Sequence, residues 1–264
     1  MSRLLDYATS TFPLWAIGVV LVAVLFASCE LGLVISRRIL KGKKRHDRDS
    51  LGYIVTAIFA LLAFMLATTF SMALSRFDTR RLALATEVDA IGTAYLRASL
   101  LDEPHASKVR RSLREYAHCR ISSPDWTIQK LEARVTECQK IGARLWEETR
   151  NAVQPVRTTA LASYMVSSVN DVLNAAVRRE IAGRAVIPAR VLSVLLICTV
   201  AASAALGSVL AGSATRFRAS TALLLTLYAV CFVLILDIDR SRTGSVAVSQ
   251  RPMSALAAQL DAQP

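Results

Sequence analysis

Four long apolar runs constrain this chain more than any other feature of its sequence. The first, residues 14–29, carries no charged side chain, and Glu30 is the only charge before Ser36. Three further runs have no charged residue: 53–75, 191–215 and 219–236. A helix needs about 20 apolar residues to cross a hydrocarbon core of about 30 Å, and each run is close to this length or above it. The runs therefore predict four transmembrane helices.

A soluble fold does not account for these runs. Hydrophobic residues make up 53% of the 264-residue chain, and four such helices would overfill the core of a soluble protein of this length. The first run also differs from a cleaved signal peptide, because its apolar stretch is too long and basic residues follow it in place of a cleavage site. We therefore expect an integral membrane protein that retains its first helix.

The spacing of the runs predicts two transmembrane hairpins joined by a soluble region. Between residues 53 and 101 there is no proline and one glycine, Gly92, and apolar residues recur at near-helical spacing beyond Arg81. The predicted boundaries are transmembrane helix 1 at 14–36, a basic loop at 37–51, transmembrane helix 2 at 52–75 continuing as a soluble helix to about 101, a helical soluble domain at 76–187, transmembrane helix 3 at 189–215, transmembrane helix 4 at 219–236 and a C-terminal tail at 237–264.

Helical periodicity also dominates the soluble region. Ser123-Pro124 is typical of a helix start, with Ser as the N-cap and Pro at the first helical position. Two apolar stripes recur at three- and four-residue spacing: Leu131, Val135, Cys138, Ile141 and Leu145, then Leu161, Met165, Val169, Val172 and Ala176. No segment alternates with period two. The predicted fold class is all-α, with four transmembrane helices in two hairpins and an intervening helical soluble domain.

The net charge of +12 invites a nucleic-acid hypothesis, but its distribution favours a membrane role. Seven basic residues gather in the short loop between the first two runs: Arg37, Arg38, Lys41, Lys43, Lys44, Arg45 and Arg48. Loops of this kind set membrane topology and contact anionic lipid headgroups. The loop has neither aromatic platforms nor a recognisable nucleic-acid-binding fold. The expected partner is the lipid bilayer, and no nucleic acid is expected to bind.

The two hairpins place the N-terminus, the soluble domain and the C-terminal tail on one side of the membrane. Among short segments, the opposite side has nine Lys and Arg residues and the two tails have four, so the positive-inside rule makes the basic loop cytoplasmic. Six arginines flank the spans on the domain side and remove this bias: Arg76, Arg80, Arg81, Arg178, Arg179 and Arg184. Charge alone leaves the orientation open.

The five cysteines and three histidines show no metal-binding spacing. Cys119 and Cys138 lie in the soluble domain and can pair only if that domain faces an oxidising compartment, which is left open. The sequence has no G-x-S-x-G, H-E-x-x-H or glycine-rich phosphate-loop motif. We therefore predict no catalytic site, cofactor or metal, and we do not expect an enzyme.

Candidate functional residues lie along the second span and where the spans meet water. One face of the second span combines small and hydroxyl residues with a single ring, which suits close helix packing or a pore with an apolar constriction: Ala60, Phe64, Thr68, Ser71 and Ser75. The topology places a set of arginines and carboxylates at one depth, as a structural network or a pore mouth: Arg76, Arg80, Arg81, Asp237, Asp239 and Arg240.

Glu30 is a further candidate, because it is an acidic residue inside the end of the first span. An ionisable group at this depth is costly unless it reaches the headgroups, faces a partner or lies in a wet cavity. The arginines expected on the same side of the membrane can supply that partner: Arg37, Arg216 and Arg218.

Two blocks of the sequence share a pattern with a known family of membrane proteins. The first block is 62–77 with Arg81, Glu87 and 90–97; the second is 236–240 with Gly244 and 248–252. In these residues the chain resembles the bestrophin-like family of bacterial membrane proteins of unknown function, except that Asp89 and Ser241 stand where the family pattern has Asn and Pro. The family is distantly similar to true bestrophins, which are pentameric ion channels.

The resemblance implies a fold, an assembly and a pore. It implies a homo-oligomer, pentameric as in bestrophins, with a cytoplasmic helical domain. Alignment on Arg76 puts Ala60, Phe64 and Thr68 at the three neck positions of the pore, of which Phe64 keeps a bulky apolar group.

Two functional hypotheses follow from the residues and the resemblance together. The first is an oligomeric ion channel of the bacterial inner membrane, with the second span lining the pore. The alternative is a non-conducting scaffold or sensor whose helical domain binds a partner. A transporter ranks third, because the sequence has no inverted repeat or broken transmembrane helix.

Overall fold

The structure is a computed structural model, and it describes residues 13–39, 45–123, 128–211, 218–240 and 246–263. Several predicted features lie outside these described residues: Lys41, Lys43 and Lys44 of the basic loop, Pro124 of the predicted helix start, and Arg216. The described residues form helices joined by short connections, with no strand among them. The all-α fold class predicted from the sequence is confirmed.

The helices belong to two compact units. The first, which we call the membrane unit, contains the described residues up to 75 together with those of 186–240 and Val246. The second, which we call the helical domain, contains the described residues of 76–185 and 247–263. Helix α3 (Arg45–Ala98) begins in the membrane unit and ends in the helical domain. It runs through 54 residues without a break, because no proline interrupts its hydrogen-bond ladder.

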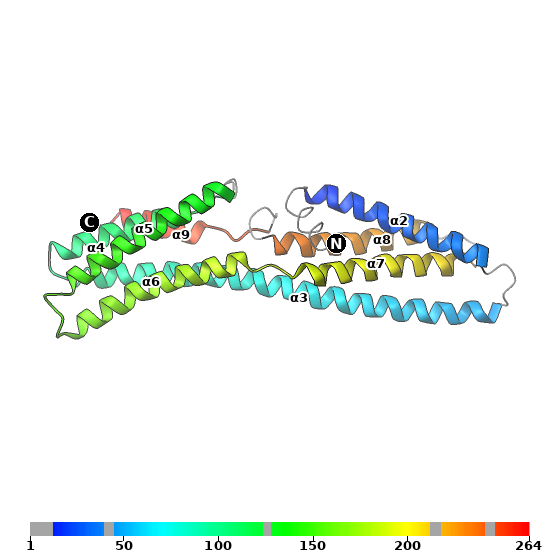
Figure 1. The fold of residues 1–264 in the computed structure, drawn as a ribbon, viewed down its shortest axis with the longest axis horizontal. Coiled ribbons are helices and arrows are strands. Elements are labelled where there is room, and N and C mark those ends of the chain that lie inside the picture. Colours follow the sequence, from blue (N-terminus) through cyan, green and yellow to red (C-terminus); the bar gives the residue numbers. More distant parts are fainter. Residues whose placement is uncertain (1–12, 40–44, 124–127, 212–217, 241–245, 264) are drawn as a thin grey trace. The chain divides into compact units, whose positions relative to one another are not determined.

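The membrane unit is built from α2 (Leu14–Ile39), the first part of α3, α7 (Ala189–Leu210) and α8 (Arg218–Asp239), all labelled in Figure 1. Four segments of the described residues are long and apolar enough to cross a membrane, and they include these four helices. Many of their large apolar side chains are exposed, such as Trp15, Val19 and Leu223. An apolar exterior of this kind fits a lipid environment, and the protein is a multi-spanning membrane protein.

Small residues bring α2 and α7 close together. A side chain at Gly32 would collide with the backbone of Ala204, and one at Gly207 would collide with the carbonyl of Cys29. Hydroxyl groups between the two helices donate hydrogen bonds to backbone carbonyls of the partner helix: Ser28 to Val200 (2.9 Å), Ser36 to Ser208 (3.0 Å) and Ser203 to Leu25 (2.6 Å). Small residues and interhelical hydroxyl bonds are the usual means by which helices associate in lipid.

The helical domain combines the second part of α3 with α4 (His105–Arg120), α5 (Ile128–Ala152), α6 (Ala160–Arg184) and α9 (Arg251–Asp261) (Figure 1). Its core takes one apolar stripe from each helix, spaced three and four residues apart as helical geometry requires. On α3 the stripe includes Leu84, Ile91, Ala94 and Ala98, and on α6 it includes Met165, Val169 and Val172. These α6 residues belong to the stripe that periodicity predicted, and all three are buried.

Helix α9 has no counterpart in the helices predicted from sequence, which assign these residues to a tail. Its buried residues Met253, Leu256, Ala257 and Leu260 repeat at helical spacing and pack in the core of the helical domain. Eleven residues make a helix that is only marginally stable by itself, so packing against the domain supplies its stability.

Candidate pore face, charged groups and a buried ion cluster

The α3 stripe, which we define as Ala60, Phe64, Thr68, Ser71 and Ser75, lies on the exposed face of its helix. At about 100° of rotation per residue, the five positions span an arc of about 80°. The opposite face is buried in the membrane unit through Leu62, Leu66, Thr69 and Ala73. Phe64 is 67% exposed and Leu62 is 1% exposed, so α3 packs through one face and presents the stripe on the other.

The stripe differs in polarity from the exposed faces of α2 and α8. Those helices expose mainly bulky aliphatic residues, including Val19, Val20 and Leu31 on α2 and Leu227 and Val230 on α8. The stripe instead exposes three hydroxyl groups. The Thr68 hydroxyl donates to the carbonyls of Phe64 (3.1 Å) and Met65 (3.0 Å), which lowers the cost of a polar group at membrane depth.

The three predicted arginines of α3 have different surroundings within the helical domain. Arg80 is buried, and its guanidinium donates to the carbonyls of Ala182 (3.4 Å) and Ala185 (2.7 Å), where α6 ends. A cation at this point satisfies carbonyls that have no partner within the helix and matches the negative end of the helix dipole. Arg81 is exposed and Arg76 is half-buried. Arg80 thus fixes the end of α6.

The predicted acidic residues lie in the membrane unit. Both Asp237 and Asp239 are buried at the end of α8. The two oxygens of the Asp239 carboxylate accept the backbone N–H of Ile187 at 2.9 and 3.1 Å, which ties the residues before α7 to the end of α8. Arg240 follows directly and is half-buried. Ion pairing between these residues and the α3 arginines stays a prediction.

Glu30 and Arg218 line one cavity of about 330 Å³ in the membrane unit. The cavity wall is otherwise mostly apolar, with Phe26 and Leu33 from α2 and Leu210 at the end of α7. Of the two described arginines proposed as partners for Glu30, Arg218 is the one that lines the same cavity. Arg37 is exposed, and ion pairing of Glu30 stays a prediction.

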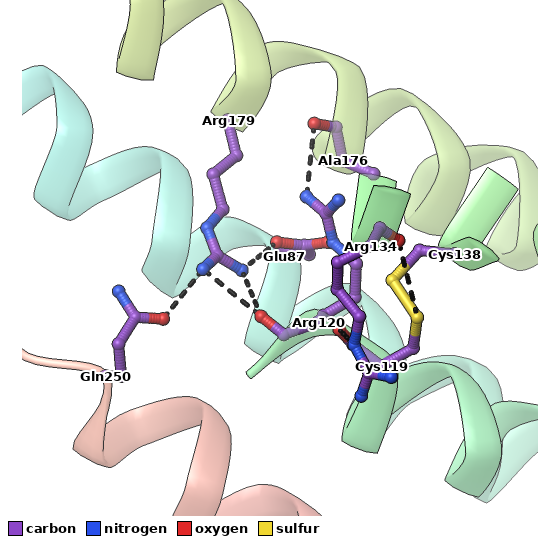
Figure 2. Close-up of polar contacts among 8 residues, drawn as sticks. All are labelled: Glu87, Cys119, Arg120, Arg134, Cys138, Ala176, Arg179 and Gln250. Carbon is purple, nitrogen blue, oxygen red and sulfur yellow. Dashed lines mark hydrogen bonds and ion pairs between the residues drawn. A yellow bond between two sulfur atoms is a disulfide. The ribbon is translucent and has the colours of Figure 1, made fainter. Parts of the chain in front are cut away.

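A buried ion cluster in the helical domain was not predicted. In Figure 2 the side chains of Arg120 and Arg179 both point toward Glu87, and we call these three residues the Glu87 cluster. The Arg120 guanidinium contacts one carboxylate oxygen of Glu87 at 2.5 Å, and Arg179 contacts the other at 2.7 Å. Arg179 also donates to the Arg120 carbonyl (3.3 Å) and to the Gln250 side chain (2.7 Å). The cluster therefore joins α3, α4 and α6 to the segment that leads into α9.

Burial makes this cluster electrostatically strong. The Glu87 side chain is 0% exposed, and those of Arg120 and Arg179 are 12% and 15% exposed. Burial by itself would lower the pKa of Arg120, but the adjacent Glu87 carboxylate outweighs it, and the pKa is raised above its usual value. Burial also raises the pKa of Tyr116, a neighbour of the cluster, to about 12. The raised pKa keeps Arg120 charged at physiological pH.

A disulfide links the end of α4 to α5. Cys119 and Cys138 form the bond, which is visible beside the Glu87 cluster in Figure 2. The Arg134 guanidinium donates to the backbone carbonyls of Cys119 and His118, both at 3.2 Å, so α5 is also hydrogen-bonded to the end of α4. Cys119, Cys138, Arg120 and Arg179 all line a cavity of about 570 Å³ within the helical domain.

One sequence signal points to the Glu87 cluster. Glu87 occupies a core position in the α3 register, three residues after buried Leu84 and four before buried Ile91. A charged residue at such a position requires buried partners. Among the described residues, no group of three or more His, Cys, Asp or Glu side chains is arranged to hold a metal ion.

The fold and these groups define a class: an all-helical membrane protein with four candidate spans and a helical domain between the second and the third. Within that class, the chain belongs to the family of the Bestrophin-like domain, whose model matches residues 18–253. This confirms the family that the two sequence blocks indicated.

Solved structures of a bacterial bestrophin homolog from Klebsiella pneumoniae share the fold. One variant of that protein matches with a TM-score of 0.60 at 14% identity, covering 95% of this chain and 99% of the homolog. A second matches with a TM-score of 0.60 at 15% identity, covering 91% and 94%. A third matches with a TM-score of 0.59 at 15% identity, covering 90% and 96%. A comparison with curated proteins found no match.

Proposed function

We propose that the protein is an oligomeric ion channel of the bacterial inner membrane in which the α3 stripe lines a central pore. The observation that carries this proposal is the exposure of three hydroxyl residues and one ring on a face of α3 that the single chain leaves uncovered. Lipid would solvate such a face poorly, because hydrocarbon offers hydroxyl groups no hydrogen-bond partner. Water in a pore would hydrate Thr68, Ser71 and Ser75.

Family membership supports an assembly around this face. A closed ring of copies places the same stripe of each copy around one axis, and a pentamer is the number that the likeness to bestrophins favours. Phe64 would then form a ring of aromatic side chains between small residues. Apolar rings of this kind gate pores by excluding water.

Planar-bilayer recording of the purified protein tests the proposal. The wild-type protein is expected to conduct ions, and Phe64→Ala is expected to raise the current per reconstituted protein, because the substitution removes the apolar constriction. Phe70→Ala is the matched control, because Phe70 lies on the same helix, is 38% exposed and is turned away from the stripe. The current of the Phe70→Ala protein is expected to equal the wild-type current. Absence of conductance in the wild-type protein, or equal increases in the two variants, would contradict the proposal.

A non-conducting sensor is the second candidate, and the cavity of about 570 Å³ in the helical domain favours it. Five arginines and two glutamates line this cavity together with apolar side chains. Such a wall suits a ligand or a partner segment with both anionic and apolar groups. In this reading the Glu87 cluster is structural, and the same bilayer recording decides between the candidates, because a sensor of this kind carries no current.

A further inference from the structure

We infer that the helical domain lies on the extracytoplasmic side of the membrane and that Cys119 and Cys138 are an oxidation site there. The two cysteines come from α4 and α5, are both 3% exposed, and have Cα atoms 5.6 Å apart, within the range that a disulfide requires. Disulfides form and persist in oxidising compartments and are rare in the cytosol. The pairing therefore reports the compartment that the domain faces.

The surroundings of the bond mark it as part of the folded domain. Cys119 precedes Arg120, whose side chain binds Glu87, and the Cys119 carbonyl accepts a hydrogen bond from Arg134. The three other described cysteines belong to the membrane unit and are free thiols: Cys29, Cys198 and Cys231. The two cysteines of the helical domain are thus the paired ones.

The charge of the short loops and tails agrees with this orientation. The segments opposite the domain have nine Lys and Arg residues, and the two tails have four. Six arginines of the helical domain flank the spans and count against this difference, and three of them bind groups within that domain. Arg80 binds carbonyls at the end of α6, Arg179 binds Glu87, and Arg184 pairs with Glu180 at 2.6 Å. The positive-inside rule counts short loops and residues within about 15–20 positions of a span, whereas the rest of a long domain crosses the membrane largely regardless of charge. With the domain placed outside by its disulfide, the loop 37–51 is cytoplasmic.

The oxidation step is an ordinary thiol–disulfide exchange. Two thiols lose two protons and two electrons as the sulfur–sulfur bond forms, and a disulfide-bearing donor protein of the extracytoplasmic compartment is reduced to a dithiol. This orientation is the reverse of the one that the likeness to bestrophins implied. It does not depend on conductance, because a sensor with the same topology would have the same disulfide.

Reporter fusions on the full-length chain test the sidedness. Alkaline phosphatase and green fluorescent protein are fused separately after Pro264, downstream of helix α9 of the helical domain, and expressed in a bacterial host. Alkaline phosphatase folds only outside the cytoplasm. Green fluorescent protein fluoresces in the cytoplasm and stays dark when it is exported unfolded. We expect phosphatase activity without fluorescence. Fluorescence without phosphatase activity would overturn the inference whatever the state of the cysteines.

Thiol counting in acid-quenched cells tests the oxidation site. The denatured wild-type chain has five cysteines and is expected to add three maleimide-polyethylene glycol groups before reduction and five after it. The control Cys119→Ser is expected to add four groups in both conditions. Five groups on the wild-type chain before reduction would overturn the oxidation site, and this result would leave conductance unaffected.

Discussion

The membrane unit and the helical domain accommodate polar groups in opposite ways. In the membrane unit, helices α2 and α7 approach through glycine, and hydroxyl groups bond to the carbonyls of the facing helix. In the helical domain, an apolar core surrounds a carboxylate that is held by two guanidiniums. The membrane unit thus avoids charge between α2 and α7, whereas the domain concentrates charge at one point.

This difference follows from what surrounds each unit. In lipid no hydrophobic force drives helices together, so close backbone approach and small polar groups must do so. In water the hydrophobic effect assembles the domain, and a buried ion cluster then restricts which helices can meet. The two regions should therefore respond to different substitutions, and two predictions test this.

The largest effect is expected at the Glu87 cluster. Glu87→Gln removes the carboxylate that holds Arg120 and Arg179 and leaves two guanidiniums buried without a counter-ion. Breaking a buried ion pair from one side costs about 3–5 kcal/mol. Chemical unfolding of the purified protein in detergent, monitored in the helical domain, should show this loss in the free energy of unfolding.

Glu147→Gln is the matched control for that substitution. Glu147 pairs with Arg150 on the surface of α5, where both side chains are at least half exposed. Surface pairs contribute about 0–1 kcal/mol, so this variant should unfold close to the wild-type midpoint. Equal losses of unfolding free energy in the two variants would show that the Glu87 cluster stabilises the domain no more than a surface pair does.

A smaller effect is expected where α2 meets α7. Gly207→Ala places a methyl group against the Cys29 carbonyl, and overpacking of this kind costs about 1–3 kcal/mol. Gly52→Ala is the control, because a side chain there meets no atom within 4 Å. The midpoint of thermal unfolding in detergent should fall for Gly207→Ala and not for Gly52→Ala. If both midpoints stay unchanged, close packing of α2 on α7 does not stabilise the membrane unit.

The parts of the structure that could be predicted from sequence are those with local signals. The apolar runs indicated spans because lipid imposes length and hydropathy on each span separately. The α6 stripe through Met165, Val169 and Val172 was predicted because periodicity within one helix shows which face it buries. The family was recognised from two short blocks, and the family model confirms it.

The parts that could not be predicted depend on partners far apart in the chain. Arg120 and Arg179 lie 33 and 92 residues from Glu87, and nothing in their immediate sequence distinguishes them from surface arginines. Helix α9 has a four-residue apolar pattern that is too short to indicate which surface covers it. The pairing of Cys119 with Cys138 requires that α4 and α5 be neighbours, which spacing alone does not show.

The central claim is that the exposed stripe of α3 faces other copies around a common axis, and cysteine cross-linking tests it most directly. In a background with Cys29, Cys198 and Cys231 replaced by Ala, Ser71→Cys is compared with Leu227→Cys on α8, which is 52% exposed. We expect oxidation in native membranes to join chains through position 71 and to leave the Leu227→Cys protein uncross-linked. Monomers for both variants, or cross-links through position 227 alone, would contradict an α3-lined axis.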